Sequence, residues 1–244
     1  MNTAASVLFS DERLVAVAKP AGVSLATSRR DPDGAVCRLI AALDDVERAR
    51  HDLDPARLLL VHRLDVGTSG VVLLARDAEA HRELVAAFTA RRVSKSYLAL
   101  VWGRPRPPAG RLEQPLGPDR RDRRRMVVDP AGRSARSDYR TLGRARHVTL
   151  LRLEPQTGRT HQLRVHLADA GHPIVGDDLY GGPRHRGVKD PGLRRALDPG
   201  RPLLHAWRLH LPPGQAVGEL IVTAPLPADI GAVLAAAGIP LPEP

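Results

Sequence analysis

Hydrophobic and polar positions follow two different periods at the start of the chain. Apolar runs at residues 6–9 and 14–18 flank a polar turn and end at Lys19-Pro20-Ala21-Gly22, which predicts two strands. Over residues 34–50, apolar side chains recur at three- and four-residue spacing. This period predicts one amphipathic helix, with Val46 on its apolar face.

The rest of the chain predicts more strands than helices. Helices are expected over about residues 77–91, with Asp77 as N-cap, over 160–170, and over 228–238. Strands are predicted at residues 58–64, 71–75, 96–102, 111–116, 125–128, 135–142, 148–154, 204–211 and 219–223. Residues 181–201, rich in Gly, Pro and Arg, are interpreted as a long surface loop. This order, which does not alternate strand and helix, predicts an α+β fold.

The composition is typical of a folded protein of the cytoplasm. Hydrophobic residues make up 43% and charged residues 26% of the chain, which is ordinary for a globular domain. No apolar stretch approaches the roughly 18 residues of a membrane helix, and charges at residues 11–13 interrupt a signal peptide. The single cysteine, Cys37, excludes an intrachain disulfide and is expected to be buried.

The charge indicates a polyanionic partner. Lys and Arg number 37 against 27 Asp and Glu, a net charge of +10. Only three of these cations are lysine, so part of the arginine excess could reflect a coding bias. Residues 119–147, however, contain ten Arg and four Asp, which concentrates most of the excess in one segment. Because aromatic residues are only 3% of the chain, contacts to RNA are expected to be led by phosphate rather than base stacking.

Two segments carry side chains suited to chemistry. His62-Arg63-Leu64-Asp65 ends a predicted strand before the turn Gly67-Thr68-Ser69-Gly70, which would hold Asp65 rigidly yet accessibly. On spacing alone, a solvated Arg/Asp pair is the better explanation. In Gly158 to Leu167, a helix start beside Arg159 suits a phosphate and Arg164 could pair with a carboxylate. An ordinary capped helix explains that segment equally well.

Three histidines, His161, His166 and His172, raise the question of a metal site. They lack the i, i+4 spacing with an intervening glutamate that zinc-hydrolase helices use. They are interpreted as structural or RNA-facing residues, and no metal site is predicted.

Together the motifs resemble those of the RluA-type pseudouridine synthases. His62-Arg63-Leu64-Asp65 with Thr68-Ser69-Gly70 resembles the family's catalytic motif, and the resemblance spans about residues 7–211. The other matching motifs are Lys19-Pro20-Ala21-Gly22, Lys95-Ser96-Tyr97, Gly158 to Leu167, His172-Pro173-Ile174-Val175-Gly176-Asp177, Leu179-Tyr180-Gly181 and Leu204-His205-Ala206. Their shared order, rather than any single motif, carries the resemblance.

The resemblance implies a pseudouridine synthase catalytic fold, with a mixed, mostly antiparallel sheet in two halves, flanking helices and a central active-site cleft. Residues 1–244 are expected to form a single catalytic domain, without the accessory N-terminal RNA-binding domain of many relatives. A monomer is expected.

The resemblance also implies an activity, the isomerisation of specific uridines to pseudouridine in structured ribosomal or transfer RNA. Asp65 would be the catalytic carboxylate, as nucleophile or as base, and Arg164 would pair with it and keep it ionised. Tyr97 would pack on the uracil, although a core role on its strand is the simpler explanation from pattern alone. The reaction involves no redox change, so no cofactor is implied.

Base flipping is part of the implied mechanism, because the enzyme must detach and rotate the uracil. Arg63 resembles the arginine that fills the gap left by the flipped nucleotide. The other residues expected to contact RNA are His62, Lys19, Lys95, Arg159, Thr160, Arg124 and Arg125.

Two other classes of function are possible for such a chain. A non-catalytic RNA-binding or ribosome-assembly protein could keep this scaffold, although intact Asp65, Tyr97 and Arg164 argue against it. A nucleotide or glycoside hydrolase would need paired carboxylates, for which Asp177 and Asp178 are the first candidates. No convincing second carboxylate stands out in the sequence.

Overall fold

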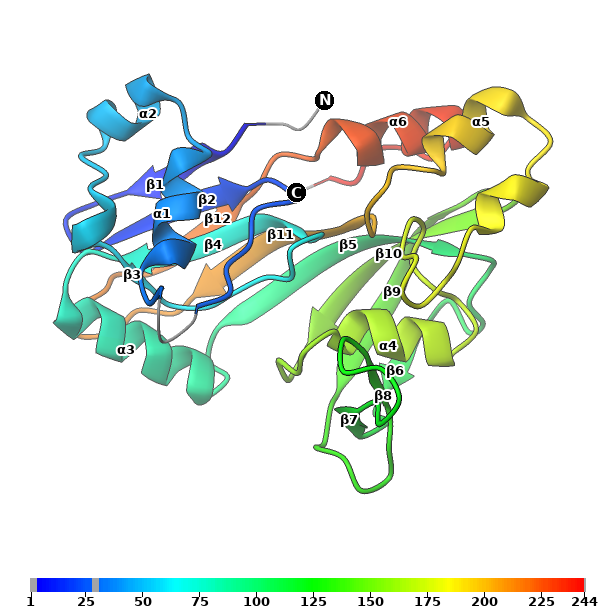
Figure 1. The fold of residues 1–244 in the computed structure, drawn as a ribbon, viewed down its shortest axis with the longest axis horizontal. Coiled ribbons are helices and arrows are strands. Elements are labelled where there is room, and N and C mark those ends of the chain that lie inside the picture. The colour runs from blue at the N-terminus through cyan, green and yellow to red at the C-terminus, as the bar shows by residue number, and fades with distance from the viewer. Residues whose placement is uncertain (1–3, 28–30, 244) are drawn as a thin grey trace. The chain divides into compact units, whose positions relative to one another are not determined.

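The computed structural model describes residues 4–27 and 31–243. The chain forms two compact units (Figure 1). Unit 1 comprises Met1–Lys95 and Ala206–Pro225, and unit 2 comprises Ser96–His205 and Leu226–Pro244.

Antiparallel strands form the core of unit 1. They are β1 (Ser6–Ser10), β2 (Leu14–Lys19), β3 (Leu59–Leu60), β4 (Ser69–Ala75), β11 (Leu204–Leu211, in unit 1 from Ala206) and β12 (Leu220–Thr223). The order is β1-β2-β4-β11, with β3 paired to β4 and β12 to β11. The predicted strand pair at the start of the chain is confirmed. All of β4 is buried, as expected for a continuous apolar run.

The single helix predicted over residues 34–50 is wrong, because the chain forms α1 (Gly34–Ala41) and α2 (Asp45–Arg50) instead. The Asp44 carboxylate accepts a hydrogen bond from Glu47 N at 2.7 Å and so starts a new helix. Val46 consequently lies on a separate, solvated helix and is 64% exposed. Cys37, expected to be buried, is exposed.

The helix predicted after Asp77 is confirmed as α3 (Ala78–Thr89). The Asp77 carboxylate accepts hydrogen bonds from the backbone N–H groups of Glu79 and Ala80, both at 2.9 Å. Leu84 of α3 and Leu73 of β4 belong to the same hydrophobic cluster in the core of unit 1. A short 3-10 helix, η1 (Pro55–Arg57), precedes β3.

Unit 2 contains antiparallel strands in the order β5-β10-β9-β6, and a separate β7–β8 hairpin. Its strands are β5 (Ser94–Trp102, in unit 2 from Ser96), β6 (Ala109–Leu112), β7 (Leu116–Pro118), β8 (Met126–Val128), β9 (Ser137–Arg144) and β10 (Val148–Pro155). The strand predicted over residues 111–116 divides between β6 and β7, because Pro115 has no N–H for a ladder hydrogen bond.

The helical segments in the described part of unit 2 are α4 (Gln162–Asp169), the 3-10 helix η2 (Arg184–Gly187), α5 (Pro191–Ala196) and α6 (Ala228–Ala237). Leu163 and Leu167 of α4 pack on the sheet, which lies behind α4 in Figure 1. Residues 181–201 are not wholly a loop, because the Asp190 carboxylate caps α5 by accepting from Leu193 N at 2.6 Å. The predicted C-terminal helix is confirmed, and Gly238 is its C-cap.

The predicted α+β class is confirmed, because helices and mostly antiparallel strands are mixed along the chain. Within the described residues, no helix has the length and apolar character needed to cross a membrane.

Candidate active site

The segment that carries Asp65 is a turn between two strands of unit 1. Regular pairing in β3 ends at Leu60 rather than at residue 64, and β4 begins at Ser69. Thr68 N donates a hydrogen bond to the Asp65 carbonyl at 3.0 Å. Leu64 is buried and Asp65 is half-buried, so the neighbouring side chain anchors the turn and Asp65 stays partly accessible.

His62 explains why β3 stops where it does. Val61 N still donates to the carbonyl of Leu73 at 3.3 Å, but Leu73 N donates to Nε2 of the His62 ring at 3.1 Å. The ring also stacks on Phe88 of α3, with centroids 4.5 Å apart. Burial, and then the nearby charge of Lys95, lower the pKa of His62 to about 3. The ring is therefore neutral, and it supports the turn rather than presenting a charge to RNA.

Lys19 is better explained as a support of this turn than as the RNA contact expected from the sequence. Its side chain is 1% exposed, and Nζ lies 2.8–3.3 Å from three backbone carbonyl oxygens. One of these oxygens belongs to Val66, and it also accepts from Gly22 N at 2.7 Å. The Lys19-Pro20-Ala21-Gly22 segment thus holds the residue that directly follows Asp65.

A close backbone approach fixes the far side of the turn. Gly70 has a φ of +119°, and a Cβ atom there would lie 2.1 Å from the carbonyl oxygen of Ala206 in β11. Only glycine satisfies both conditions. The glycine of the Thr68-Ser69-Gly70 motif therefore lets β11 pack directly beside the start of β4.

Two cations near the turn have no carboxylate partner in the described part of the chain. Arg63 is exposed and forms no hydrogen bond or ion pair with a described residue. Lys95 Nζ lies 5.9 Å from the ring centroid of Phe88. Burial, followed by the charge of Arg91, lowers the pKa of Lys95. Both remain predicted RNA contacts.

Tyr97 lies on β5 opposite Leu153 of β10. It is half-buried and packs against the hydrophobic cluster that contains Leu153 and Leu163. A half-buried ring of this kind can stack on a planar base as well as contribute to the core.

Arg164 of α4 is held by a carboxylate that sequence reasoning did not assign to it. Its Nε and Nη2 donate to the two carboxylate oxygens of Asp177 at 2.7 and 2.8 Å, and Asp177 is 1% exposed. This bidentate geometry fixes the plane of the guanidinium. A guanidinium has five N–H groups, so Arg164 can also bind a second acceptor. The expected pairing of Arg164 with Asp65 stays a prediction.

The start of α4 is organised by the buried side chain of Gln162. Its Oε1 accepts from Thr157 Oγ1 at 2.7 Å and from Arg159 N at 3.0 Å. The backbone N–H of Arg159 is therefore satisfied within the protein. Arg159 Nε donates to a backbone carbonyl at 3.1 Å, and Thr160 is exposed. The side chains of Arg159 and Thr160 remain predicted RNA contacts.

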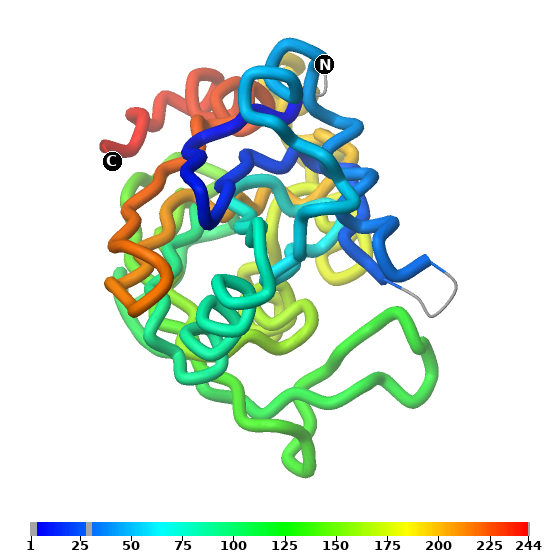
Figure 2. The backbone as a smooth tube through the Cα atoms, turned by 90° about the vertical axis from the view of Figure 1, so that its left-hand side faces the viewer, coloured from blue at the N-terminus to red at the C-terminus, as the bar shows by residue number. Residues whose placement is uncertain are grey.

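We call residues 116–128, which comprise β7, β8 and the loop between them, the arginine-rich hairpin. Figure 2 shows this segment, in green, projecting from unit 2. Arg124 is exposed and donates two hydrogen bonds to the Asp122 carboxylate at 3.0 and 2.7 Å. The guanidinium carbon of Arg125 lies 5.3 Å from the ring centroid of Tyr180. Sequence reasoning noted Tyr180 only as part of a motif.

The three histidines considered for a metal each have a separate partner. His166 Nε2 lies 2.9 Å from the Gln114 carbonyl oxygen, and burial lowers the pKa of His166. His172 Nδ1 lies 2.9 Å from the carbonyl oxygen of Trp102, and His161 lies beside Tyr180. Among the described residues, no three His, Cys, Asp or Glu side chains gather in a way that could hold a metal.

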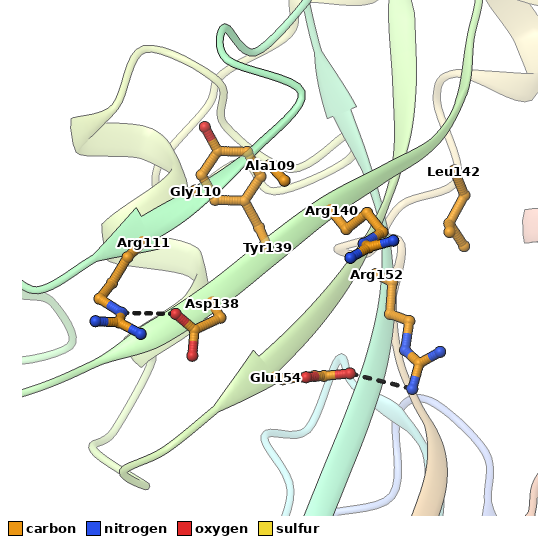
Figure 3. Close-up of a pocket in the computed structure, with 9 residues that line it drawn as sticks. All are labelled: Ala109, Gly110, Arg111, Asp138, Tyr139, Arg140, Leu142, Arg152 and Glu154. Atoms are coloured by element: carbon orange, nitrogen blue, oxygen red, sulfur yellow. Dashed lines mark hydrogen bonds and ion pairs between the residues drawn. The ribbon is translucent and has the colours of Figure 1, made fainter.

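A cavity of about 870 Å³ opens on the outer face of the unit 2 sheet (Figure 3). Four of its charged side chains form pairs, because Arg111 donates to Asp138 at 2.7 Å and Arg152 lies 3.1 Å from Glu154. None of the predicted site residues lines it. This cavity is therefore not a candidate active site.

Comparisons with known proteins identify the family. Residues 13–169 match the family described as RNA pseudouridylate synthase. An uncharacterized RNA pseudouridine synthase of Chloroflexus aurantiacus is 43% identical over 88% of this chain, and ribosomal large subunit pseudouridine synthase D of Nitrosomonas europaea is 37% identical over 94%. The chain spans 64% of the length of each of these relatives.

A comparison with solved structures indicates the same family. The solved structure of human RNA pseudouridylate synthase domain containing 4 has a TM-score of 0.76 and 27% identity, and the match covers 98% of this chain and 95% of the human chain. The chain therefore belongs to the RNA pseudouridylate synthase family, and its resemblance to the RluA-type members is confirmed.

Proposed function

We propose that this chain isomerises uridine to pseudouridine in RNA, with Asp65 as the catalytic carboxylate. The observation that carries the proposal is the turn around Asp65. Lys19 and Gly22 hold its backbone through Val66, and His62 and Gly70 fix its two ends. A rigid support that leaves one carboxylate partly accessible suits a catalytic group, and the family supplies the reaction.

The reaction requires three changes on one nucleotide. The bond between N1 of uracil and C1′ of ribose breaks, a bond from C5 to C1′ forms, and the hydrogen on C5 leaves as a proton while N1 gains one. Asp65 would attack C1′ or remove a ribose proton, and both roles need the ionised carboxylate. In this proposal Arg164 stabilises that ionised form, and Tyr97 packs on the uracil near C5.

Arg63 is proposed to fill the space that the flipped nucleotide leaves. The side chain is exposed and has no partner among the described residues, so entering a helix would break no protein contact. Flipping costs a few kcal/mol of lost stacking and pairing. A guanidinium that stacks on neighbouring bases would offset part of this cost.

Phosphate contacts are proposed for the arginine-rich hairpin and for the α5 region. A cavity of about 540 Å³ in unit 2 is lined by His185, Arg186, Pro191, Arg194, Arg195 and Asp198. The single carboxylate there, on Asp198, lies 3.6 Å from Nε2 of His185. The three arginines form no ion pair with a described residue, and a cavity with this surplus of positive charge favours a polyanion.

The RNA substrate is proposed to be ribosomal or transfer RNA. The name of the Nitrosomonas europaea relative refers to the large ribosomal subunit, which makes large-subunit RNA the first candidate. We further propose that both units together form one catalytic domain, which acts as a monomer in the cytoplasm.

The hydrolase alternative is weakened by the state of its candidate carboxylates. Both oxygens of Asp177 accept hydrogen bonds from Arg164, which suits a structural anion better than a general acid. Asp178 is exposed. A non-catalytic RNA-binding protein would not need the contacts that hold the turn around Asp65.

The test is product analysis. The purified protein is incubated with unmodified ribosomal and transfer RNA transcripts, and the RNA is digested to nucleosides and separated. Pseudouridine would support the proposal. Released uracil would indicate a hydrolase, and RNA binding with neither product would indicate a binding protein.

A further inference from the structure

Tyr180 contacts both the arginine-rich hairpin and the residues that place Arg164. Its hydroxyl accepts a hydrogen bond from Met126 N at 2.9 Å and lies 2.8 Å from Nδ1 of His161. Its ring centroid lies 5.0 Å from the guanidinium carbon of Arg164. One side chain thus joins the first residue of β8, the N-cap residue of α4, and the arginine proposed for catalysis.

The Met126 contact has a fixed direction, and the direction of the His161 contact depends on the His161 tautomer. Met126 N can only donate, so the Tyr180 hydroxyl accepts there, and its own hydrogen is available to His161 Nδ1 when the ring proton is on Nε2. Burial raises the pKa of Tyr180, so the hydroxyl keeps its hydrogen at neutral pH. The hydroxyl therefore has one partner on the hairpin and one at the N-cap of α4.

His161 makes this contact matter for Arg164. It has a φ of +54°, in the left-handed region that residues with a side chain seldom adopt. It is also the N-cap of α4 and has no capping hydrogen bond from its own side chain. The hydrogen bond to Tyr180 therefore supports an unfavourable backbone conformation one helical turn before Arg164.

A single short turn holds Arg164 in two ways. Gly181 N donates to the carbonyl of Asp177 at 2.7 Å, which closes the turn from Asp177 to Gly181. The Asp177 carboxylate binds Arg164 edge-on, and the Tyr180 ring contacts its guanidinium. Arg125 lies against the same ring, with its guanidinium carbon 5.3 Å from the ring centroid, so an arginine of the hairpin and Arg164 share one aromatic contact.

We infer that Tyr180 is a positioning residue that links RNA binding at the arginine-rich hairpin to the placement of Arg164. Phosphates on the hairpin steady Met126 and Arg125, and Tyr180 passes this restraint to His161 and Arg164. The link acts on turnover more than on affinity. Its effect on catalysis rests on the proposed function, whereas the link itself lies within unit 2.

The first test is Tyr180→Phe, which keeps the ring and removes both hydroxyl contacts. We expect kcat to fall roughly tenfold, while the Kd for RNA changes by less than about twofold. Tyr139→Phe is the matched control, because the Tyr139 hydroxyl donates to the Pro107 carbonyl at 3.1 Å, outside this network. Thermal unfolding shows that both variants fold. An unchanged kcat, or an equal fall in the control, would overturn the inference.

The second test is a double-mutant cycle with Arg124→Ala. In the native background this change should lower both RNA affinity and kcat, whereas in Tyr180→Phe it should lower affinity alone. The fold reduction in kcat of the double variant could instead equal the product of the two single-variant reductions, within about twofold. The two sites would then be independent, and Tyr180 would not be the link.

A third measurement needs no catalysis. Adding RNA to the native protein should slow amide hydrogen exchange in the arginine-rich hairpin and in α4, and in Tyr180→Phe only in the hairpin. Slowed exchange in α4 of the variant would contradict the link. A native protein that shows the expected exchange pattern but forms no pseudouridine would defeat the proposed function and still support the link.

Discussion

A buried ammonium group needs several acceptors, and Lys19 has three carbonyl oxygens around its Nζ. The carbonyl of Val66 is one of them and directly follows Asp65 in the chain. At the residue scale, the proposed catalytic carboxylate thus depends on a cation that stabilises the backbone beside it. Lys19 is a positioning residue in this account.

Replacing Lys19 with methionine should destabilise the protein. Lys19→Met keeps the length of the side chain but removes the ammonium donor from the carbonyl oxygens of Pro20, Val23 and Val66. Only the Val66 oxygen keeps another donor, Gly22 N, and we expect a cost of about 1–3 kcal/mol in the free energy of unfolding. Urea denaturation measures the change. Lys189→Met is the control, because Lys189 is exposed and should tolerate the change. Equal stability of the two variants would contradict the role assigned to Lys19.

The low pKa of His62 predicts a pH dependence of stability. The pKa is about 3 in the folded protein and about 6.5 in an unfolded chain. Between these values the unfolded state binds a proton that the folded state does not. The free energy of unfolding should therefore fall as pH falls from about 6.5 toward 3, by at most ~1.4 kcal/mol per pH unit from this residue.

His62→Gln tests this assignment, because glutamine can still accept from Leu73 N and does not titrate. Urea denaturation at pH 7 and pH 5 gives the loss of stability on acidification for each protein. The variant should lose less stability than the native protein over this range. An equal loss would show that His62 does not carry the effect.

At the scale of elements, the turn between β3 and β4 is held by β11, which packs beside Gly70 at the start of β4. Gly70→Ala would push a Cβ atom to 2.1 Å from the Ala206 carbonyl oxygen at a φ of +119°. We expect a loss of about 3 kcal/mol or more in the free energy of unfolding, because the cost of overpacking and the cost of backbone strain add to each other.

Gly218→Ala is the matched control in the same unit, because a Cβ atom there meets nothing within 4 Å. Chemical denaturation of both variants measures the difference. A Gly70→Ala variant as stable as Gly218→Ala would mean that β4 and β11 are not packed as described.

The spacing of apolar residues along the sequence predicted the elements whose ends follow from burial of one face. The strand pair at the start, α3 and β11 follow from apolar spacing and local caps. The break between α1 and α2 did not, because it depends on the Asp44 cap competing with a continuing helix. β3 is shorter than its apolar run because a side chain, His62, takes the N–H of Leu73.

The candidate site was found in the sequence through motifs, and its supports were not. Asp177 lies 13 residues from Arg164, and Met126 lies 54 residues from Tyr180. Local spacing carries no information about such partners, because the fold alone brings them together. The role of Lys19 was missed for a related reason, since a lysine beside a turn is usually solvated.

At the scale of the whole molecule, the surplus of positive charge predicts salt-sensitive RNA binding. For single-stranded RNA, log K should fall with log salt at a slope of about −0.7 per neutralised phosphate. Replacing Arg121, Arg123 and Arg124 of the arginine-rich hairpin with alanine should therefore flatten the slope by up to about 2.

A triple change at Arg48, Arg50 and Arg57 removes the same charge from the α2 and η1 region and is the control. Filter binding at several salt concentrations measures both slopes. The hairpin would not be the phosphate-binding element if the two triple variants had the same slope.

The most direct test of the account is tritium release from RNA labelled at C5 of uridine. Asp65→Asn keeps the shape of the side chain and removes its charge, and Asp178→Asn is the control because Asp178 is exposed. We expect release with the native protein and with Asp178→Asn, and only background release with Asp65→Asn. Release by Asp65→Asn at the native rate would contradict the role of Asp65, and no release by the native protein from ribosomal or transfer RNA would contradict the proposed activity.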